Sequence, residues 1–197
     1  MKATIYLITF SRLGFAAVFA ALVGLADAGE GLSLVMAAGI IVVAIVGEIT
    51  DTLDGQLARR TGNVTELGGL LDPLMDSLSR LIMFFALALV GWITIAVPLV
   101  MGFRDIVVSY TRIIQARTGG KTSARWSGKI KAVVQAVVAP VVVACVWVGG
   151  AFPAFATAAI WAIHSLSGLL IAVTLWSMLD YIRGAWKGIH RMYTGRN

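Results

Sequence analysis

Four aspartates occur in two closely spaced pairs, and their spacing suits a metal site. Asp51 and Asp54 are three residues apart, and Asp72 and Asp76 are four residues apart. On α-helices these separations place the acids of each pair on one face, so two facing helices would bring four carboxylates together. Oxygen ligands without histidine or cysteine favour a hard cation. The sequence therefore predicts bound Mg²⁺ or Mn²⁺, with two ions shared among the acids.

Small residues accompany both acidic pairs. Gly55 and Ala58 follow Asp54 on the same helical stripe, and Gly68 lies one turn before Asp72. They keep a space open beside the carboxylates, and Mg²⁺ held by a few carboxylates commonly takes its remaining ligands from substrate phosphates. Two carboxylates about 4 Å apart repel by on the order of 4 kcal/mol at an effective dielectric constant of 20, so we expect the cluster to bind cations. In the alternative, the acids form structural ion pairs with Arg59, Arg60 and Arg80.

The composition indicates that the helices carrying these acids lie in lipid. Of the 197 residues, 59% are apolar and 13% are charged, whereas roughly 25% of the residues in an ordinary soluble domain are charged. A soluble domain of this length has too little interior to hide so much apolar surface. We therefore expect one all-α, polytopic membrane domain covering residues 1–197.

Six apolar segments approach the length of about 20 residues that a membrane span needs. The stretch between Arg80 and Arg104 is uncharged and is expected to turn near Gly91 and Trp92. The long uncharged stretch after Ala132 is expected to divide at Gly149, Gly150 and Pro153. The predicted helices lie near residues 7–26, 32–49, 69–91, 92–112, 132–149 and 153–179.

The basic residues support this count of six helices. With six crossings, the loops on one side carry nearly all the positive charge, and the loops on the other side carry only Asp27 and Glu30. Cytoplasmic loops of membrane proteins are rich in lysine and arginine, so both termini are predicted to be cytoplasmic. A five-helix arrangement would split the basic loops across the membrane. This distribution also explains the net charge of +6 by attraction to anionic lipid, without a nucleic-acid partner.

The acidic segment resembles the signature of the CDP-alcohol phosphotransferases. That signature is Asp-x2-Asp-Gly-x2-Ala-Arg-x8-Gly-x3-Asp-x3-Asp, and every position is filled at the right spacing by Asp51, Asp54, Gly55, Ala58, Arg59, Gly68, Asp72 and Asp76. The family's six helices agree with the predicted spans, so the resemblance extends over nearly the whole chain. It implies a homodimer in a bacterial inner membrane, with the active site facing the cytoplasm.

The resemblance also implies a reaction and roles for individual residues. A CDP-linked lipid, usually CDP-diacylglycerol, places its pyrophosphate on the metal ions, an alcohol attacks the phosphorus nearest the lipid, and CMP leaves. Asp51, Asp54, Asp72 and Asp76 are the implied metal ligands, and Asp76 is also the implied general base. The residues implied to contact the CDP-lipid are Thr9, Gly55, Ala58, Arg59, Thr65 and Gly68.

The region after the signature is similar to that of the phosphatidylglycerophosphate synthase branch of the family. The similar segments are 7–12, 104–112, 127–135 and 174–181, although Tyr6 stands where that branch usually has asparagine. We expect a cationic pocket for an acceptor phosphate such as sn-glycerol 3-phosphate, because arginine clamps phosphate and lysine adds a point charge. The expected pocket residues are Arg104, Arg112, Lys129 and Lys131.

Several alternatives remain at this stage. A sister enzyme would use inositol phosphate or serine as acceptor, and inositol phosphate would also fit a cationic pocket. A small cation transporter could use the aspartates as its ion site, although the two halves of the chain show no repeat symmetry. An inactive lipid-binding scaffold has no reason to retain four repelling acids.

Overall fold

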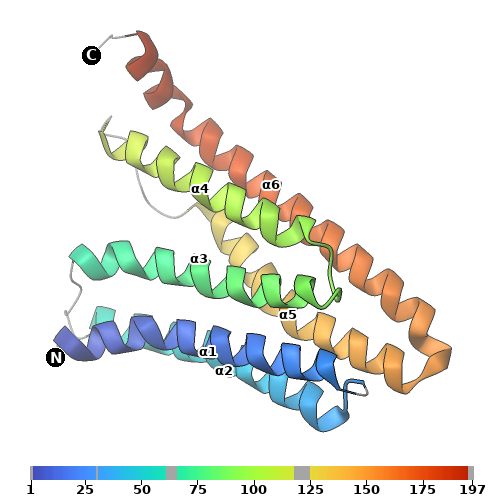
Figure 1. The fold of residues 1–197 in the computed structure, drawn as a ribbon. Coiled ribbons are helices and arrows are strands. Elements are labelled where there is room, and N and C mark those ends of the chain that lie inside the picture. Colours follow the sequence, from blue (N-terminus) through green and yellow to red (C-terminus); the bar gives the residue numbers. More distant parts are fainter. Residues whose placement is uncertain (1, 30, 61–65, 118–124, 195–197) are drawn as a thin grey trace.

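The part of the chain that the structure describes forms six long helices (Figure 1). The computed structural model describes residues 2–29, 31–60, 66–117 and 125–194, and it describes side chains outside 2–10, 51–60, 66–70 and a few positions after Trp186. The helices are α1 (Lys2–Ala28), α2 (Leu34–Arg60), α3 (Glu66–Leu89), α4 (Ala96–Arg117), α5 (Trp126–Ala151) and α6 (Ala156–Thr194), with the short 3₁₀ helix η1 (Pro153–Phe155) before α6. The described residues contain no strand, which confirms the predicted all-α class.

The two predicted turns fall close to the expected positions. Gly91 lies between α3 and α4 with a φ of +73°, a conformation that glycine adopts without steric cost. The second break comes later than predicted, because Gly149 and Gly150 continue α5 and the helix ends at Ala151. Phe152 is extended and is followed by a proline. A residue before proline disfavours the helical conformation, so proline and not the glycines ends this helix.

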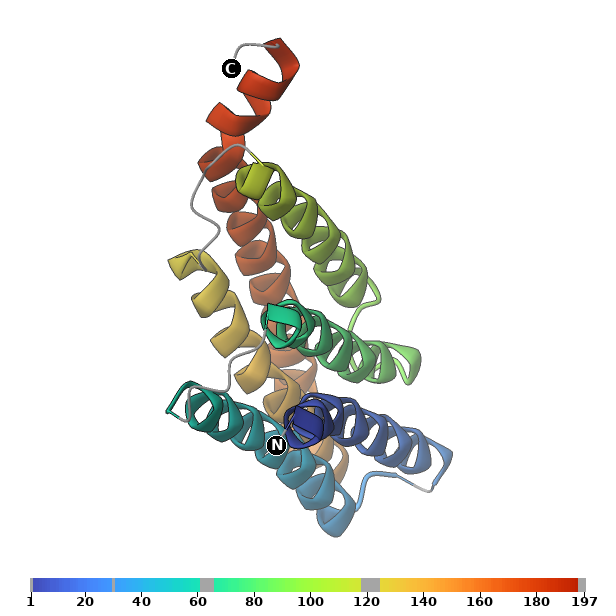
Figure 2. The same ribbon diagram turned by 90° about the vertical axis from the view of Figure 1, so that its left-hand side faces the viewer.

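Successive helices run in alternating directions, so α1, α3 and α5 end on the side of the bundle where α2, α4 and α6 begin (Figure 1). The start of α1 and the end of α6 lie on the same side, at the left in Figure 1, together with the end of α2 and the start of α3. α1 packs against α2 and α3, whereas α6 packs against α4 and α5. Seen from the end of the bundle, α5 links these two groups by packing on both α2 and α6 (Figure 2).

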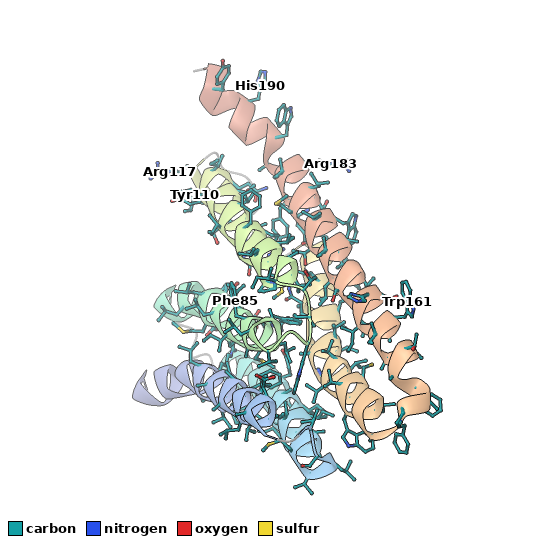
Figure 3. All side chains as sticks on the ribbon, turned by 45° about the vertical axis from the view of Figure 1, so that its right-hand side comes forward. Phe85, Tyr110, Arg117, Trp161, Arg183 and His190 are labelled. Carbon is teal, nitrogen blue, oxygen red and sulfur yellow. The ribbon has the colours of Figure 1, made fainter. Side chains whose placement is uncertain are left out.

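A continuous apolar core holds these helices together. Its fully buried side chains come from α1, α2, α3, α4, α5 and α6, and the largest are Phe19, Ile40, Phe84, Leu87, Met101, Val142 and Leu170. Many large apolar side chains point outward instead, such as Trp161 on α6, which is 67% exposed (Figure 3). An outward apolar surface of this kind is typical of lipid-facing helices.

Three helical segments of the described chain are long and apolar enough to cross a membrane by themselves. They are Ser11–Ala28, Trp126–Ala151 and Pro153–Trp186, and the apolar part of α2, Leu34–Thr50, is somewhat shorter. α3 and α4 contain charged side chains at positions inside the bundle, which lowers their hydropathy. Charged residues inside membrane helices are costly and are usually retained for function, so these two helices are where a site is expected.

Candidate active site

The two aspartate pairs lie at the same end of the bundle. Asp51 and Asp54 are in the last turns of α2, and Asp72 and Asp76 are in the first turns of α3. Those two helix ends lie on the same side of the molecule (Figure 1). The side chains of Asp51 and Asp54 lie outside the described part, so the four-carboxylate cluster stays a prediction. Among the described side chains, no group of three or more His, Cys, Asp or Glu residues is arranged to hold a metal ion.

A small cavity separates α2 from α3 just inside these helix ends. Its volume is about 30 Å³, which is about the share of one water molecule in the liquid. α1, α2 and α3 form its walls, and the polar side chains at its surface are those of Arg12, Glu48, Asp76, Ser79 and Arg80. The cavity is therefore lined by charged groups of both signs, within helices that are otherwise apolar.

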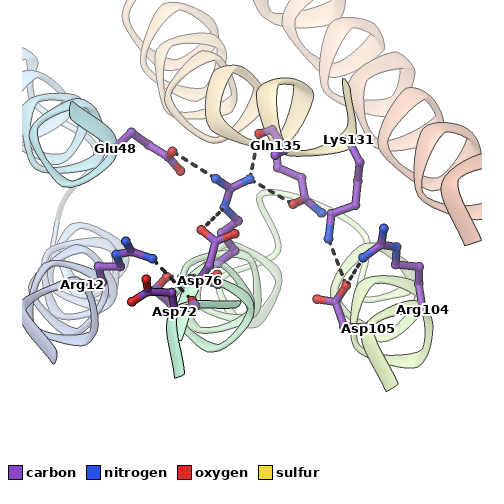
Figure 4. A network of polar contacts seen from close by, with 11 residues as sticks. Arg12, Glu48, Asp72, Asp76, Arg104, Asp105, Lys131 and Gln135 are labelled. Carbon is purple, nitrogen blue, oxygen red and sulfur yellow. Dashed lines mark hydrogen bonds and ion pairs between the residues drawn. The ribbon is translucent and has the colours of Figure 1, made fainter. Parts of the chain in front are cut away.

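Arg80 connects the charged groups around this cavity. Figure 4 shows its partners Glu48, Asp76 and Gln135 around it. Its Nε lies 3.2 Å from Oδ1 of Asp76, and its Nη2 lies 3.1 Å from Oε2 of Glu48. Its Nη1 donates to the carbonyl oxygen of Ala132 at 2.8 Å and to Oε1 of Gln135 at 3.4 Å. Arg12 contacts the start of α3 separately, donating to the carbonyl oxygen of Asp72 at 3.5 Å. The predicted alternative of ion pairing is thus present for Asp76, but its arginine is shared with a second carboxylate.

The charge and backbone geometry of this region suit a hard cation. Its described charged side chains are two arginines (Arg12 and Arg80) and three acids (Glu48, Asp72 and Asp76), which leaves one negative charge in excess. Asp51 follows Glu48 by three residues on α2, and its side chain lies outside the described part. The donor set is entirely oxygen, as Mg²⁺ and Mn²⁺ prefer.

Arg12, Glu48 and Arg80 were not predicted as site residues. Glu48 lies one helical turn before Asp51, and Arg80 lies one turn after Asp76. Both are charged residues within apolar helices, which is itself a signal of function. Arg80 was predicted only as an ion-pair partner of the aspartates.

The predicted acceptor residues on α4 and α5 lie further along the bundle. Arg104 and Lys131 are each 7% exposed, and both contact Oδ1 of Asp105, at 2.8 Å and 3.0 Å. Arg104 also donates to Oγ of Ser177 on α6 at 2.7 Å. The structure therefore brings Arg104 and Lys131 together, with one carboxylate between them that offsets part of their charge.

Tyr181 on α6 brings a third predicted cation, Arg112, into this group. The guanidinium carbons of Arg104 and Arg112 lie 5.2 Å and 5.3 Å from the centroid of its ring, within the range of a cation–π contact. The fourth predicted residue, Lys129, is exposed and makes its described contact elsewhere, with its ammonium 5.7 Å from the centroid of the Trp126 ring. Three of the four predicted cations are thus connected through Asp105 and Tyr181.

An ion pair at the start of α5 holds this helix against α6. Nε and Nη2 of Arg125 donate to the two carboxylate oxygens of Asp180, at 2.7 Å and 2.8 Å, and Oγ of Ser127 donates to the same carboxylate at 2.6 Å. The hydrogen bonds to Asp180 raise the pKa of Arg125 above its ordinary value. Ser177, Asp180 and Tyr181 were not predicted as site residues, although they fall in the segment 174–181 that resembles the same branch of the family. The resemblance does not show that they reach α4 and α5.

The predicted nucleotide-contacting residues fall where the side chains are not described. Thr9 is in the first half of α1, Gly55, Ala58 and Arg59 are near the end of α2, and Gly68 is in the first turn of α3. Thr65 lies outside the described residues. Their contacts with a CDP-lipid remain predictions.

The helical architecture and the acidic signature define a membrane-embedded family of phosphatidyl-transferring enzymes. The family profile described as CDP-alcohol phosphatidyltransferase matches residues 4–176, so this chain belongs to that family and is an integral membrane protein. It is similar to the CDP-diacylglycerol–glycerol-3-phosphate 3-phosphatidyltransferase of Pseudomonas fluorescens, with 37% identity over 145 residues, which are 70% of this chain and 69% of the relative. It is also similar to the proteins of that name from Escherichia coli strain K12 and Salmonella choleraesuis, each 30% identical over 148 residues, or 71% of this chain and 74% of the relative.

Proposed function

We propose that this protein transfers the phosphatidyl group of CDP-diacylglycerol to sn-glycerol 3-phosphate, giving phosphatidylglycerophosphate and CMP. The observation that carries this proposal is the complete acidic signature on two helix ends that lie at one end of the bundle. The names of the similar proteins from Pseudomonas fluorescens and Escherichia coli support the same substrates.

In this reaction the hydroxyl oxygen of the acceptor attacks the phosphorus that bears diacylglycerol. A new phosphorus–oxygen bond forms as the bond to the CMP oxygen breaks, and the proton of the hydroxyl passes to the carboxylate of Asp76. Asp76 suits this role because its side chain is 38% exposed beside the cavity, and a base must reach the proton that it removes. Asp51, Asp54, Asp72 and Asp76 would hold Mg²⁺ or Mn²⁺, which supplies positive charge to neutralise the pyrophosphate and the departing CMP.

The acceptor phosphate is proposed to bind among Arg104, Arg112, Lys129 and Lys131. Arg104 and Lys131 are almost fully buried, and buried cations need anionic partners. Asp105 supplies one negative charge for the two, so one positive charge remains for a phosphate. Serine would not need this charge. Inositol phosphate carries the same group as glycerol 3-phosphate and is therefore the second candidate acceptor.

The proposed membrane arrangement has all six helices crossing, with both termini and the active site on the cytoplasmic side. It is supported by the alternating helix directions and by the basic residues at the end of the bundle where α1 begins and α6 ends. A homodimer in a bacterial inner membrane is part of the same proposal and rests on the family resemblance.

The deciding experiment measures CMP release from CDP-diacylglycerol by purified protein in detergent. Parallel reactions contain glycerol 3-phosphate, inositol phosphate or serine, with and without Mg²⁺, and Asp76→Asn is the control variant. Release that requires both glycerol 3-phosphate and Mg²⁺, and is lost in the variant, is the expected result. Release with another acceptor would keep the chemistry and change the substrate. If no acceptor gives CMP, ion flux in liposomes becomes the test of the transporter alternative.

A further inference from the structure

Arg80 is a buried cation in the middle of an apolar helix. The residue is 8% exposed and its neighbours along α3 include Leu81, Ile82 and Met83. A buried charge is unfavourable unless it is paired and hydrogen-bonded. Every polar group that surrounds Arg80 is therefore informative about why the charge is retained.

The guanidinium group of Arg80 contacts three helices at once. It meets Asp76 on its own helix, Glu48 on α2, and both Gln135 and the carbonyl oxygen of Ala132 on α5. The flat guanidinium directs its nitrogens in fixed directions, so the partners on α2 and α5 determine where its Nε edge lies. That edge is the one that faces Asp76 (Figure 4).

We propose that Arg80 is a positioning residue that orients the carboxylate of Asp76. Glu48 helps to hold the guanidinium of Arg80 in place and shares its positive charge. Nε lies at ion-pair distance, 3.2 Å, from one carboxylate oxygen of Asp76, Oδ1, without forming a hydrogen bond to it. The guanidinium, held by α2 and α5, therefore attracts this oxygen by its charge and keeps it on one side. Glu48 supplies a second negative charge to the same guanidinium, so the arginine does not fully neutralise Asp76. This inference rests on the proposed function, in which Asp76 is the general base and a metal ligand.

Lysine could not perform the same task. Its ammonium is a compact charge on a flexible stem and has no rigid set of nitrogens to bridge two helices to Asp76. A role in orientation therefore predicts that Arg80→Lys fails although it keeps the charge. A role in charge balance alone predicts that Arg80→Lys behaves as the unchanged protein does.

Metal affinity separates the two roles still further. If Arg80 only balanced charge, Arg80→Gln would remove a competing cation, and Mn²⁺ would bind more tightly. If Arg80 orients a metal-holding carboxylate, Arg80→Gln would weaken Mn²⁺ binding, because residues that orient metal ligands typically contribute about 10- to 100-fold to affinity or activity. The two roles predict opposite signs.

The experiment titrates purified full-length protein in detergent with Mn²⁺ and measures free Mn²⁺ by electron paramagnetic resonance. The variants are Arg80→Lys, Arg80→Gln and Glu48→Gln, and Arg117→Gln is the matched control at an exposed arginine at the end of α4 (Figure 3). Unfolding temperature is measured on every sample, and kcat and the KM for each substrate are measured on the same preparations.

The expected result is weaker Mn²⁺ binding by about 10- to 100-fold in both Arg80 variants, with a similar fall in kcat and unchanged KM values. Tighter binding in Arg80→Gln, or a fully active Arg80→Lys, would overturn the inference. If the Arg80 variants do not fold, the nearly isosteric Glu48→Gln decides: lower kcat and weaker Mn²⁺ binding support the proposal, and no change in either overturns it. Absence of CMP release by the unchanged protein would refute the proposed function alone, because Mn²⁺ titration does not require turnover.

Discussion

The hydroxyl oxygen of Tyr181 on α6 lies 3.1 Å from Nη2 of Arg112 on α4 and accepts its hydrogen bond. The backbone amide of Arg125 donates to the same oxygen, also at 3.1 Å. The whole Tyr181 residue is 1% exposed, so its ring has little freedom to move. One tyrosine therefore fixes an arginine of the proposed acceptor pocket and the start of α5 in a single arrangement.

Tyr181→Phe is predicted to raise the KM for glycerol 3-phosphate by about tenfold. Phenylalanine keeps the ring that makes the cation–π contacts and loses the hydrogen bonds from Arg112 and from the backbone amide of Arg125. A hydrogen bond to a charged group contributes roughly 1.5–3 kcal/mol. About 1.4 kcal/mol corresponds to tenfold. Steady-state kinetics in detergent measures the effect, with an unchanged KM for CDP-diacylglycerol. Tyr110→Phe is the matched control, because Tyr110 lies near Arg112 in the sequence of α4 but is 66% exposed. Equal effects of the two variants would contradict the assigned role.

Gly128→Ala is predicted to raise the same KM for a different reason. A Cβ at this position would lie 2.9 Å from the hydroxyl oxygen of Tyr181, closer than real Cβ atoms come. Tyr181 would have to shift away from Arg112, although neither hydrogen-bonding group is removed. Kinetics of Gly128→Ala and of the double variant with Tyr181→Phe tests this. The KM of the double variant should not exceed the larger of the two single-variant KM values. If the two effects on KM multiply in full, Gly128 does not act through Tyr181.

The positions of the helices could be predicted well because they depend on local patterns. The turn at Gly91 follows from a glycine in an uncharged stretch too long for one helix. The alternating helix directions follow from the prediction of six membrane-crossing helices. Three predicted helices were too short, because the prediction covered only their apolar parts: α2 continues to Arg60, α5 begins at Trp126 and α6 continues to Thr194. The smaller error at Gly149 and Gly150 has a local cause. Glycine weakens a helix by roughly 1 kcal/mol, which packing overcomes, whereas proline removes a donor and clashes with the preceding turn.

The contacts that organise the site could not be predicted from the sequence. Arg80 and Glu48 are 32 residues apart, and Arg112 and Tyr181 are 69 residues apart. Nothing in the local pattern distinguishes such partners from other charged or aromatic residues in apolar helices. The aspartates could be predicted because their spacing repeats with the helical period. The contact of Arg80 with Glu48 could not, because it depends on how α2 and α3 pack together.

Asp105→Asn is predicted to destabilise the protein. Asp105 is in contact with two almost fully buried cations, Arg104 and Lys131, and removing one member of a buried ion pair typically costs roughly 3–5 kcal/mol. Thermal unfolding in detergent, followed by tryptophan fluorescence, measures the loss. Asp27→Asn is the control at an exposed acid. Adding Lys131→Met to Asp105→Asn should recover part of the loss, and an unfolding temperature equal to that of the unchanged protein would contradict the ion-pair interpretation.

The membrane orientation can be tested with single cysteines. The native Cys145 is removed as Cys145→Ser, and a cysteine is placed at one end of the bundle by Tyr193→Cys or at the other end by Asp27→Cys. Tyr193 is 90% exposed near the end of α6, and Asp27 is exposed near the end of α1. The positive-inside distribution predicts that a membrane-impermeant maleimide labels Asp27→Cys in intact spheroplasts of a bacterial host. Tyr193→Cys should be labelled only after permeabilisation. The reverse pattern would place the acidic signature on the outer side of the membrane, where cytoplasmic glycerol 3-phosphate cannot reach it. That result would refute both the proposed orientation and glycerol 3-phosphate from the cytoplasm as the acceptor.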